Sequence, residues 1–349
     1  MTDYSIDVAL KSVPHEIFFN LRKKTKHPNT MAFLIDVGNR KPVKEIVVSI
    51  GGGTIITSDS ALNPPKEIYP HNSMKEIIEY CESNNLSLVD YVKKFEDDDI
   101  LEYASSCYDA MKAAVERGIH TEGELIGELH LKRKAPEMYR RLLNEPDQNS
   151  KSTYELKMCI ASTAVSEENS VGNIIVIAPT AGSCGVIPGV LAYLEARGNT
   201  RQEILESMLV AGLIGIICKT NGSVSGAEAG CQAEIGVAGA MGAGAIANAK
   251  KMPIRKIAQS AEIALEHSLG LTCDPVLGYV QVPCIERNAM YALKAKNAVT
   301  LAKLTPNALT VISFDDSVKT MVETGRDLKS GYRETGKKGL SKLFRKSKK

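Results

Sequence analysis

The segment "SGAEAGCQAEIGVAGAMGAGAIANAK" (residues 225–250) contains Gly226 and Gly230, then Gly239 and Gly242, at three- to four-residue spacing. Residues at this spacing share one face of a helix, and small side chains there let a neighbouring helix approach closely. The string "GAGAIA" superficially resembles a dinucleotide-binding turn, but no strand precedes it and no ribose-binding acid follows within a βαβ unit. The segment therefore favours closely packed helices over a Rossmann fold.

Helical patterns continue on both sides of this segment. Towards the N-terminus, Ser73 and Ser87 are candidate N-caps of helices rich in regularly spaced apolar residues. Towards the C-terminus, "KMPIRKIAQSAEIALEHSLGLT" predicts a helix with Pro253 in its first turn and Gly270 at its C-terminal cap. We therefore expect a mainly α protein in which residues 63–335 form one large all-helical domain.

The two ends of the chain have different patterns. Residues 1–62 are expected to form a short β-rich segment, with strands at "MAFLIDV" (31–37) and "VKEIVVSI" (43–50) and a third apolar stretch in "GGGTIIT". Three strands without a covering helix would leave one face of the sheet open. At the other end, "KKGLSKLFRKSKK" holds seven Lys and Arg residues and no acid, so residues 336–349 are expected to be a basic, disordered tail.

Composition limits the classes of function. The longest apolar run, "MLVAGLIGIIC" (208–218), is far shorter than the roughly 20 residues of a membrane span, so no membrane association is expected. A basic groove with interleaved aromatic residues, as in nucleic-acid-binding proteins, is not evident, so no nucleic acid is expected. We expect a cytoplasmic protein, in which the eight cysteines are buried thiols or metal ligands and not disulfides.

Three of these cysteines lie at positions suited to metal binding. Cys273 follows the end of a predicted helix, and Cys284 lies in the first turn of the next helix, which Pro283 begins. The partial positive charge of a helix N-terminus favours a thiolate there. Cys231 lies in the glycine-rich segment, and the resulting spacing, C-x41-C-x10-C, differs from zinc ribbons and ferredoxins. From spacing alone, packing in the core remains an alternative for each thiol.

The strings "GAEAGCQAEIGVAGAM", "GLTCDPVLGYVQVPCIERNA" and "APTAGSCGVIPG" resemble the iron-sulfur-dependent L-serine dehydratases (L-serine ammonia-lyases), in their alpha chain or C-terminal catalytic domain. The resemblance extends from about residue 90 to residue 335. It implies a 4Fe-4S cluster held by Cys231, Cys273 and Cys284, with one iron left open to act as a Lewis acid on the serine hydroxyl. The implied reaction converts L-serine to pyruvate and ammonia.

"APTAGSCG" (178–185) suits the binding of a substrate carboxylate. Its small residues can expose backbone N–H groups beside the hydroxyls of Thr180 and Ser183, with Gly182 between them. A plain turn that enters the following helix is the alternative interpretation.

The sequence departs from the family pattern in two ways. Family members carry a preceding domain with an "SSSHTxGP"-like string, whose histidine is thought to serve in acid/base chemistry, and no such string occurs here. The resemblance therefore implies a beta subunit that supplies the base. Lys219 and His267 are weaker candidates within the chain, and His267 also suits a helix-capping role. A terminal cysteine that folds back onto the cluster in some family members is also absent.

Three other functions remain open from the sequence. The chain could be a non-catalytic cluster-binding or regulatory subunit, or an iron-sulfur lyase acting on L-cysteine. A pyridoxal-phosphate dehydratase would use a glycine-rich phosphate loop and a Schiff-base lysine, for which "SIGGGT" and Lys219 are superficial matches. The order and setting of these two features are wrong for that class.

Overall fold

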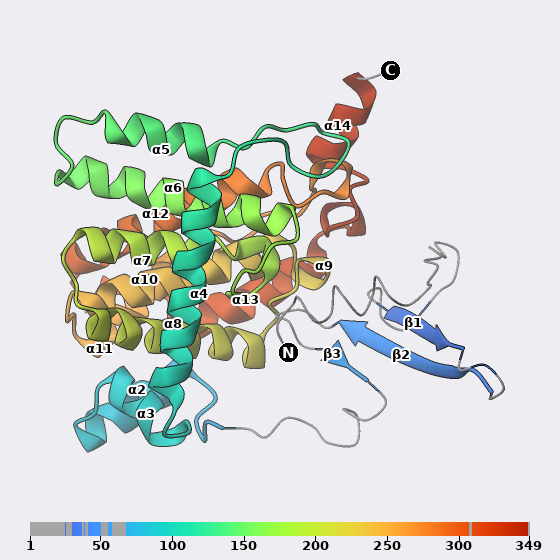
Figure 1. Ribbon diagram of the computed structural model, residues 1–349. Helices are drawn as coiled ribbons and strands as arrows, with labels where there is room; N and C mark the ends of the chain where they lie inside the picture. The colour runs from blue at the N-terminus through green and yellow to red at the C-terminus, as the bar shows by residue number, and fades with distance from the viewer. Residues whose placement is uncertain are drawn as a thin grey trace. The chain divides into compact units, whose positions relative to one another are not determined.

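The computed structural model describes residues 25, 30–36, 38, 41–49, 55–57, 68–306 and 309–347. Two compact units make up the chain, Met1–Pro65 and Lys66–Lys349. Most of the predicted β-rich segment 1–62, including the glycines of "SIGGGT", lies outside the described residues. Helices dominate the second unit (Figure 1), which confirms the prediction of a mainly α protein.

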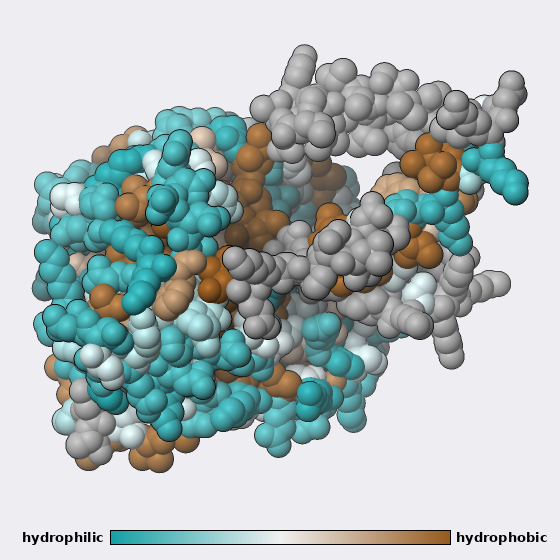
Figure 2. All heavy atoms as spheres, turned by 90° about the horizontal axis from the view of Figure 1, so that it is seen from below, coloured by the Kyte–Doolittle hydropathy of each residue, from teal (hydrophilic) through white to brown (hydrophobic). Residues whose placement is uncertain are grey.

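The described part of the first unit is a small antiparallel sheet. It contains β1 (Thr30–Ile35), β2 (Val43–Ser49) and β3 (Ile55–Ile56) in the order β1-β2-β3, and Met31 pairs with Val47. Adjacent residues of a strand point to opposite faces, yet Phe33 and Leu34 are 48% and 73% exposed. Apolar side chains therefore lie open on both faces of the sheet. Figure 2 shows some of them as brown patches on the strand segment.

The second unit contains thirteen described α-helices and several short turns of other helix types. Ser73 and Ser87 each form a capping box at the start of α2 and α3, as predicted. The α-helices are α2 (Met74–Asn84), α3 (Leu88–Phe95), α4 (Ile100–His120), α5 (Ala135–Leu143), α6 (Lys151–Ser170), α7 (Val186–Ala196), α8 (Arg201–Asn221), α9 (Gly226–Ala229), α10 (Val237–Ala249), α11 (Ile254–Glu266), α12 (Cys284–Leu304), α13 (Phe314–Asp327) and α14 (Gly339–Ser347).

Helix α10 forms the centre of the helical unit, in contact with α7, α8, α11 and α12 (Figure 1). Its small residues allow this close packing. A Cβ atom at Gly239 would lie 3.0 Å from the Tyr291 ring, and one at Gly242 would lie 2.9 Å from Val190 Cγ2. Residues 237–247 of α10 are therefore buried on all sides, as the small-residue pattern predicted, whereas Gly226 belongs to the short helix α9 and Gly230, with a φ of +77°, lies between the two helices.

The boundaries of α11 differ slightly from the prediction. The helix begins at Ile254, one residue after Pro253, and ends at Glu266 with His267 as its C-cap. Gly270 has a φ of +81°, which favours glycine, but it ends the turn that follows the helix and does not cap it. A turn at residues 267–270 therefore separates the end of α11 from Cys273.

The C-terminal segment is helical where a disordered tail was expected. Helix α14 occupies Gly339–Ser347. The Ser341 side chain is buried and its Oγ accepts a hydrogen bond from Leu277 N at 3.2 Å, while Leu340 N donates to Asp274 Oδ2 at 2.7 Å. The expectation of disorder was wrong for these residues because their start packs onto the loop that follows Cys273, in spite of their basic charge.

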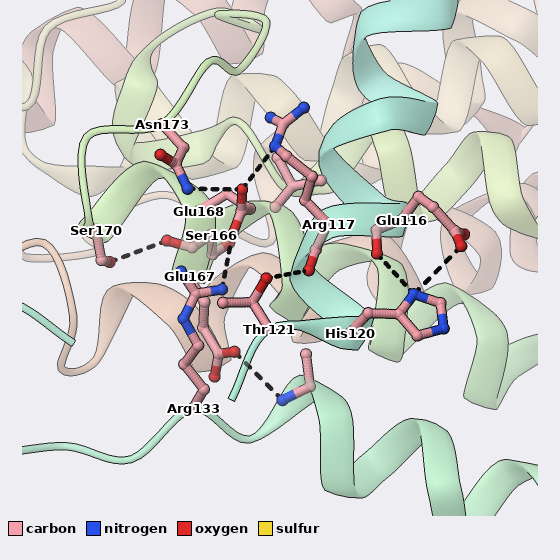
Figure 3. A network of polar contacts seen from close by, with 12 residues as sticks. Glu116, Arg117, His120, Thr121, Arg133, Ser166, Glu167, Glu168, Ser170 and Asn173 are labelled. Atoms are coloured by element: carbon pink, nitrogen blue, oxygen red, sulfur yellow. Dashed lines mark hydrogen bonds and ion pairs between the residues drawn. The ribbon is translucent and has the colours of Figure 1, made fainter. Parts of the chain in front are cut away.

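A buried ionic network connects α6 with the loops next to it (Figure 3). Glu168, on α6, accepts hydrogen bonds from Arg133 Nη1 at 2.6 Å, Arg117 Nε at 3.0 Å and Asn173 Nδ2 at 2.9 Å. Arg117 Nη2 also donates to Ile174 O at 2.6 Å. Burial opposes ionisation of Glu168, but the hydrogen bonds from the two arginines and the amide outweigh it and lower the pKa of the carboxyl. The network fixes the loop that leads from α6 to residues 178–185.

Candidate active site

Two of the predicted cysteines lie together with a buried carboxylate. The Sγ atoms of Cys231 and Cys273 and a carboxylate oxygen of Glu234 all lie within 4.8 Å of one another, and all three residues are buried. Cys231 directly precedes a π-helical turn, Gln232–Gly236, which continues into α10. Such turns are rare and occur often at functional sites. Here the turn places Glu234 on the same side as the Cys231 thiol.

Cys273 is held by a segment far away in the sequence. Its N–H donates to Tyr332 O at 2.8 Å, and its carbonyl accepts a hydrogen bond from Glu334 N at 2.7 Å. These two bonds form an isolated parallel bridge between Cys273 and Arg333. The segment "GYRET" therefore fixes the backbone of a candidate ligand and brings Glu334 to the site.

Cys284 is the first residue of α12, directly after Pro283, as predicted. Its thiol is buried, and its electrostatic interactions include Cys231, Glu234 and Arg287. The fold thus brings Cys231, Cys273 and Cys284 into one region, although only the first two belong to the tight group with Glu234.

The thiols differ in their tendency to ionise. A hydrogen bond from the Cys273 thiol lowers the pKa of Cys231 to about 7 against the effect of burial, and Arg287 adds to the shift. The pKa of Cys273 is raised, first by this same hydrogen bond and then by burial. Burial and the charge on Cys231 raise the pKa of Cys284. Of the three thiols, that of Cys231 therefore ionises most readily.

The turn "APTAGSCG" lies beside these thiols. A Cβ atom at Gly182 would lie 3.4 Å from Glu234 Oε1, and the Thr180 hydroxyl donates to the Glu234 carboxylate. The Ser183 side chain instead faces inward: its Oγ lies 3.1 Å from Thr180 Oγ1 and 3.2 Å from Ala178 O. Thr180 and Gly182 therefore face Glu234, whereas the Ser183 hydroxyl holds the turn together.

Asn288 connects the turn to the helix of Cys284, a role that the sequence analysis missed. Its Oδ1 accepts a hydrogen bond from Gly185 N at 2.8 Å, and its Nδ2 donates to Gly182 O and Cys284 O, both at 2.9 Å. The available signal was its position four residues after Cys284, one helical turn along the same face.

Glu234 and Glu334 were also missed by the sequence analysis. Burial raises the pKa of Glu234 well above its ordinary value, and the charges of Glu334 and Cys231 add to this effect. The signal for Glu234 was its position three residues after Cys231. No comparable signal exists for Glu334, which reaches the site through the bridge to Cys273.

Lys219 and His267, the two weaker candidates for the base, lie at helix ends. Lys219 is exposed in the last turn of α8. His267 Nδ1 lies 2.9 Å from Ile263 O at the end of α11, which confirms the capping interpretation.

The remaining histidines also have other partners or lie outside the described residues. His71 contacts the rings of Tyr80 and Tyr91, while His120 and His130 pair with glutamates on the surface. His15 and His27 lie outside the described residues.

A mainly helical unit with three buried cysteines beside a glycine-containing turn defines a candidate metal-dependent enzyme site. The model of the serine dehydratase alpha chain family matches residues 44–341. The chain belongs to this family.

Named relatives match nearly the whole chain. It is 38% identical to L-serine dehydratase 2 of Escherichia coli over 93% of the chain and 73% of that relative. It is also 38% identical to L-serine dehydratase of Haemophilus influenzae, over 94% of the chain and 73% of the relative. The corresponding enzyme of Helicobacter pylori is 34% identical, over 95% of the chain and 76% of the relative.

Among the described residues, each helix is either too short or too polar to cross a membrane.

Proposed function

We propose that this protein acts in the dehydration of L-serine to pyruvate and ammonia, with a 4Fe-4S cluster bound by Cys231, Cys273 and Cys284. The convergence of these three buried thiols beside the Thr180–Gly182 turn carries the proposal. Relatives named L-serine dehydratase cover over nine tenths of the chain and support the reaction. All eight cysteines are free thiols, which suits a reducing compartment such as the cytoplasm.

The donor set fits an iron-sulfur cluster. Thiolates are the preferred ligands of such clusters, and three of them leave one iron without a protein thiolate. When bound, the cluster would supply a Lewis acid that makes the serine hydroxyl a better leaving group. Arg287 would offset the thiolate charge, since its guanidinium interacts electrostatically with all three cysteines and its Nη1 donates to Thr272 O at 2.8 Å. Burial of the three cysteines would exclude water from the ligand thiolates.

The chain's own residues would bind and orient the substrate. Thr180 and Gly182 would face its carboxylate with a hydroxyl group and a backbone N–H, which suits the recognition of an anion by a turn. Ser183 would complete this substrate-binding set, because its hydroxyl contacts the Thr180 hydroxyl. Asn288 would support it in the same way, because its amide donates a hydrogen bond to the Gly182 carbonyl. The backbone of the turn is already fixed by its hydrogen bonds, and the Thr180 hydroxyl would redirect its one proton from Glu234 to the substrate carboxylate.

A partner chain or domain, corresponding to the family's beta subunit, would supply the base that removes the α-proton. Exposed apolar residues on the loops around the turn support this part of the proposal. Ile126, Ile174, Ile177 and Val280 are 41–63% exposed. Val280 Cγ1 would lie 3.8 Å from a Cβ at Gly182, and Gln281 Nε2 donates to Ile126 O at 2.7 Å. An apolar rim of this kind suits a covering domain.

The test is an anaerobic assay of the cluster-reconstituted chain, alone and with a separately expressed "SHTxGP"-bearing domain. We expect pyruvate formation from L-serine only when both are present. Turnover by the chain alone at an unchanged rate would contradict the partner role. Iron binding without turnover of L-serine under either condition would instead support a non-catalytic, cluster-binding subunit. The same assay with L-cysteine, in which released sulfide is measured, tests the alternative of a lyase that acts on L-cysteine.

A further inference from the structure

Two carboxyl groups meet beside the cysteines, at a place where the backbone carries no side chain. A Cβ atom at Gly226 would overlap Glu234 Oε2 and would lie 2.7 Å from Glu334 Oε1. Glu234 also accepts the hydrogen bond of the Thr180 hydroxyl. The carboxyls of Glu234 and Glu334 therefore converge above Gly226, and any larger residue at that position would displace both.

The two glutamates reach this point from opposite directions. Glu234 comes from the π-helical turn and is only 9% exposed. Glu334 comes from the segment paired with Cys273 and, as a whole residue, remains exposed to solvent. Glu234 is thus the more deeply buried residue of the pair.

The backbone of Glu334 adopts an uncommon conformation. Its φ is +57°, in the left-handed region that non-glycine residues rarely occupy. Residues held in such conformations cluster at binding and active sites, where the surrounding structure stabilises them. Here the hydrogen bond from Glu334 N to Cys273 O fixes the strained residue and aims its side chain at Glu234.

The described neighbours of Glu234 include hydroxyl, thiol and carboxyl groups. They are the Thr180 hydroxyl, the Cys231 thiol, the Cys273 thiol, at 3.7 Å from Oε2, and the Glu334 carboxyl. An ammonium group placed between Glu234 and Glu334 could donate a hydrogen bond to each carboxyl group, and such charge-assisted hydrogen bonds are among the stronger ones.

The substrate of the proposed function carries such a group. In an α-amino acid the ammonium and the carboxylate are attached to the same carbon, so their binding groups must be neighbours. Gly182, of the turn assigned to the carboxylate, has its Cβ position 3.4 Å from Glu234 Oε1. The two sets of groups are therefore neighbours, as the binding of one small zwitterion requires.

We propose that Glu234 and Glu334 together bind the α-ammonium group of the substrate amino acid, an assignment that rests on the proposed function. The pair would select amino acids over hydroxy acids of the same length. It would also orient the α-carbon, because ammonium and carboxylate would be held at two fixed points.

The experiment compares two ligands that differ in the ammonium group, using the reconstituted enzyme with its partner domain. L-Serine carries the group, whereas 3-hydroxypropanoate keeps the carboxylate and the hydroxyl without it. Affinities are measured by calorimetry and by inhibition of pyruvate formation, for the wild type, Glu334→Gln and Glu234→Gln. Glu323→Gln, at an exposed position on α13, is the matched control.

We expect Glu334→Gln to weaken L-serine binding by about tenfold to a hundredfold, since a charge-assisted contact is lost, and to leave 3-hydroxypropanoate binding unchanged. Cluster absorbance should stay normal in this variant. Equal weakening of both ligands, or no change for either, would overturn the assignment while wild-type turnover still supports the proposed function. A wild-type enzyme that does not turn over L-serine would overturn the proposed function itself.

If Glu234→Gln lowers the cluster absorbance, Glu334→Gln alone decides the question.

Discussion

Asn288 and Gly185 are joined by a hydrogen bond of 2.8 Å, which ties the helix that begins at Cys284 to the turn that contains Thr180 and Gly182. The same side-chain amide also donates to Gly182 O and Cys284 O. A single buried side chain thus sets the position of a candidate ligand relative to the groups proposed to bind substrate.

Asn288→Ala should therefore affect both stability and substrate binding. Removal of the amide leaves the Gly185 N–H and the Gly182 carbonyl without their partner, which costs about 1–3 kcal/mol for each buried group that stays unpaired. Urea unfolding should show this loss, and the KM for L-serine should rise. Asn297→Ala, at an exposed position on the same helix, should change neither quantity. An unchanged KM in Asn288→Ala would contradict the positioning role.

Gly185 itself should not tolerate a side chain. A Cβ atom there would overlap Ser162 O and lie 2.5 Å from Ser166 Oγ on α6. We expect Gly185→Ala to lower the free energy of unfolding by more than about 2 kcal/mol, because the turn must move away from α6. Gly212→Ala is the control, since no atom lies within 4 Å of its Cβ position in α8, and it should stabilise the protein by up to about 1 kcal/mol. Similar stability of both variants would show that the turn adapts easily.

Thr180 and Ser183 should respond differently to removal of their hydroxyls. Thr180→Val should weaken L-serine binding and should affect unfolding less than Ser183→Ala does, because the Ser183 hydroxyl keeps its hydrogen bond to Ala178 O. Ser183→Ala should lower the free energy of unfolding by about 1–2 kcal/mol as well, since its buried hydroxyl holds the turn. Calorimetric titration with L-serine and urea unfolding separate the two effects. An unchanged affinity in Thr180→Val would remove Thr180 from the substrate site.

Glu168→Gln should destabilise the protein strongly. It removes the charge that two arginines share, and the side chains of Glu168 and Arg133 are 0% and 4% exposed. Breaking a buried pair in this way costs about 3–5 kcal/mol. Glu137→Gln, which affects exposed pairs with Arg140 and Arg141, should lower the free energy of unfolding far less. A loss of similar size in both variants would contradict the structural role of the network.

The effect of Glu168 should also depend on pH. Its pKa is lower in the folded protein than in the unfolded chain, so its ionised form stabilises the fold at pH values above the ordinary carboxyl pKa of about 4.3. This contribution is lost as the pH falls through the lowered, folded-state pKa. The difference in unfolding free energy between the wild type and Glu168→Gln should therefore be constant near neutral pH and shrink in acid. A difference that grows in acid would contradict the assignment.

Local signals in the sequence were sufficient for several features of the fold. The small residues of α10, the caps at Ser73 and Ser87 and the start of α12 at Cys284 all depend on neighbours within a few residues. Cysteines 231, 273 and 284 were selected by helix ends and by resemblance, and the structure places them in one region. Their role as cluster ligands stays a prediction.

Features that depend on distant contacts could not be predicted in this way. Cys273 pairs with residues 332–334, and this pairing, not a local pattern, brings Glu334 to Glu234. The helix at residues 339–347 had a usable signal, because Leu340, Leu343 and Phe344 have helical spacing. The many basic residues of this segment led to the expectation of disorder instead. The hydrogen bond between Leu277 N and Ser341 joins residues far apart in the sequence, so local patterns could not predict it.

The iron content of single cysteine variants tests the central claim most directly. Cys231→Ala, Cys273→Ala and Cys284→Ala would be reconstituted anaerobically beside Cys159→Ala and Cys218→Ala, which remove thiols outside the proposed set. Iron and sulfide would be quantified together with the charge-transfer absorbance. We predict about four irons per chain in the wild type and both controls, and loss of the cluster in each of the three site variants. Retention of about four irons per chain in all three site variants would contradict the account.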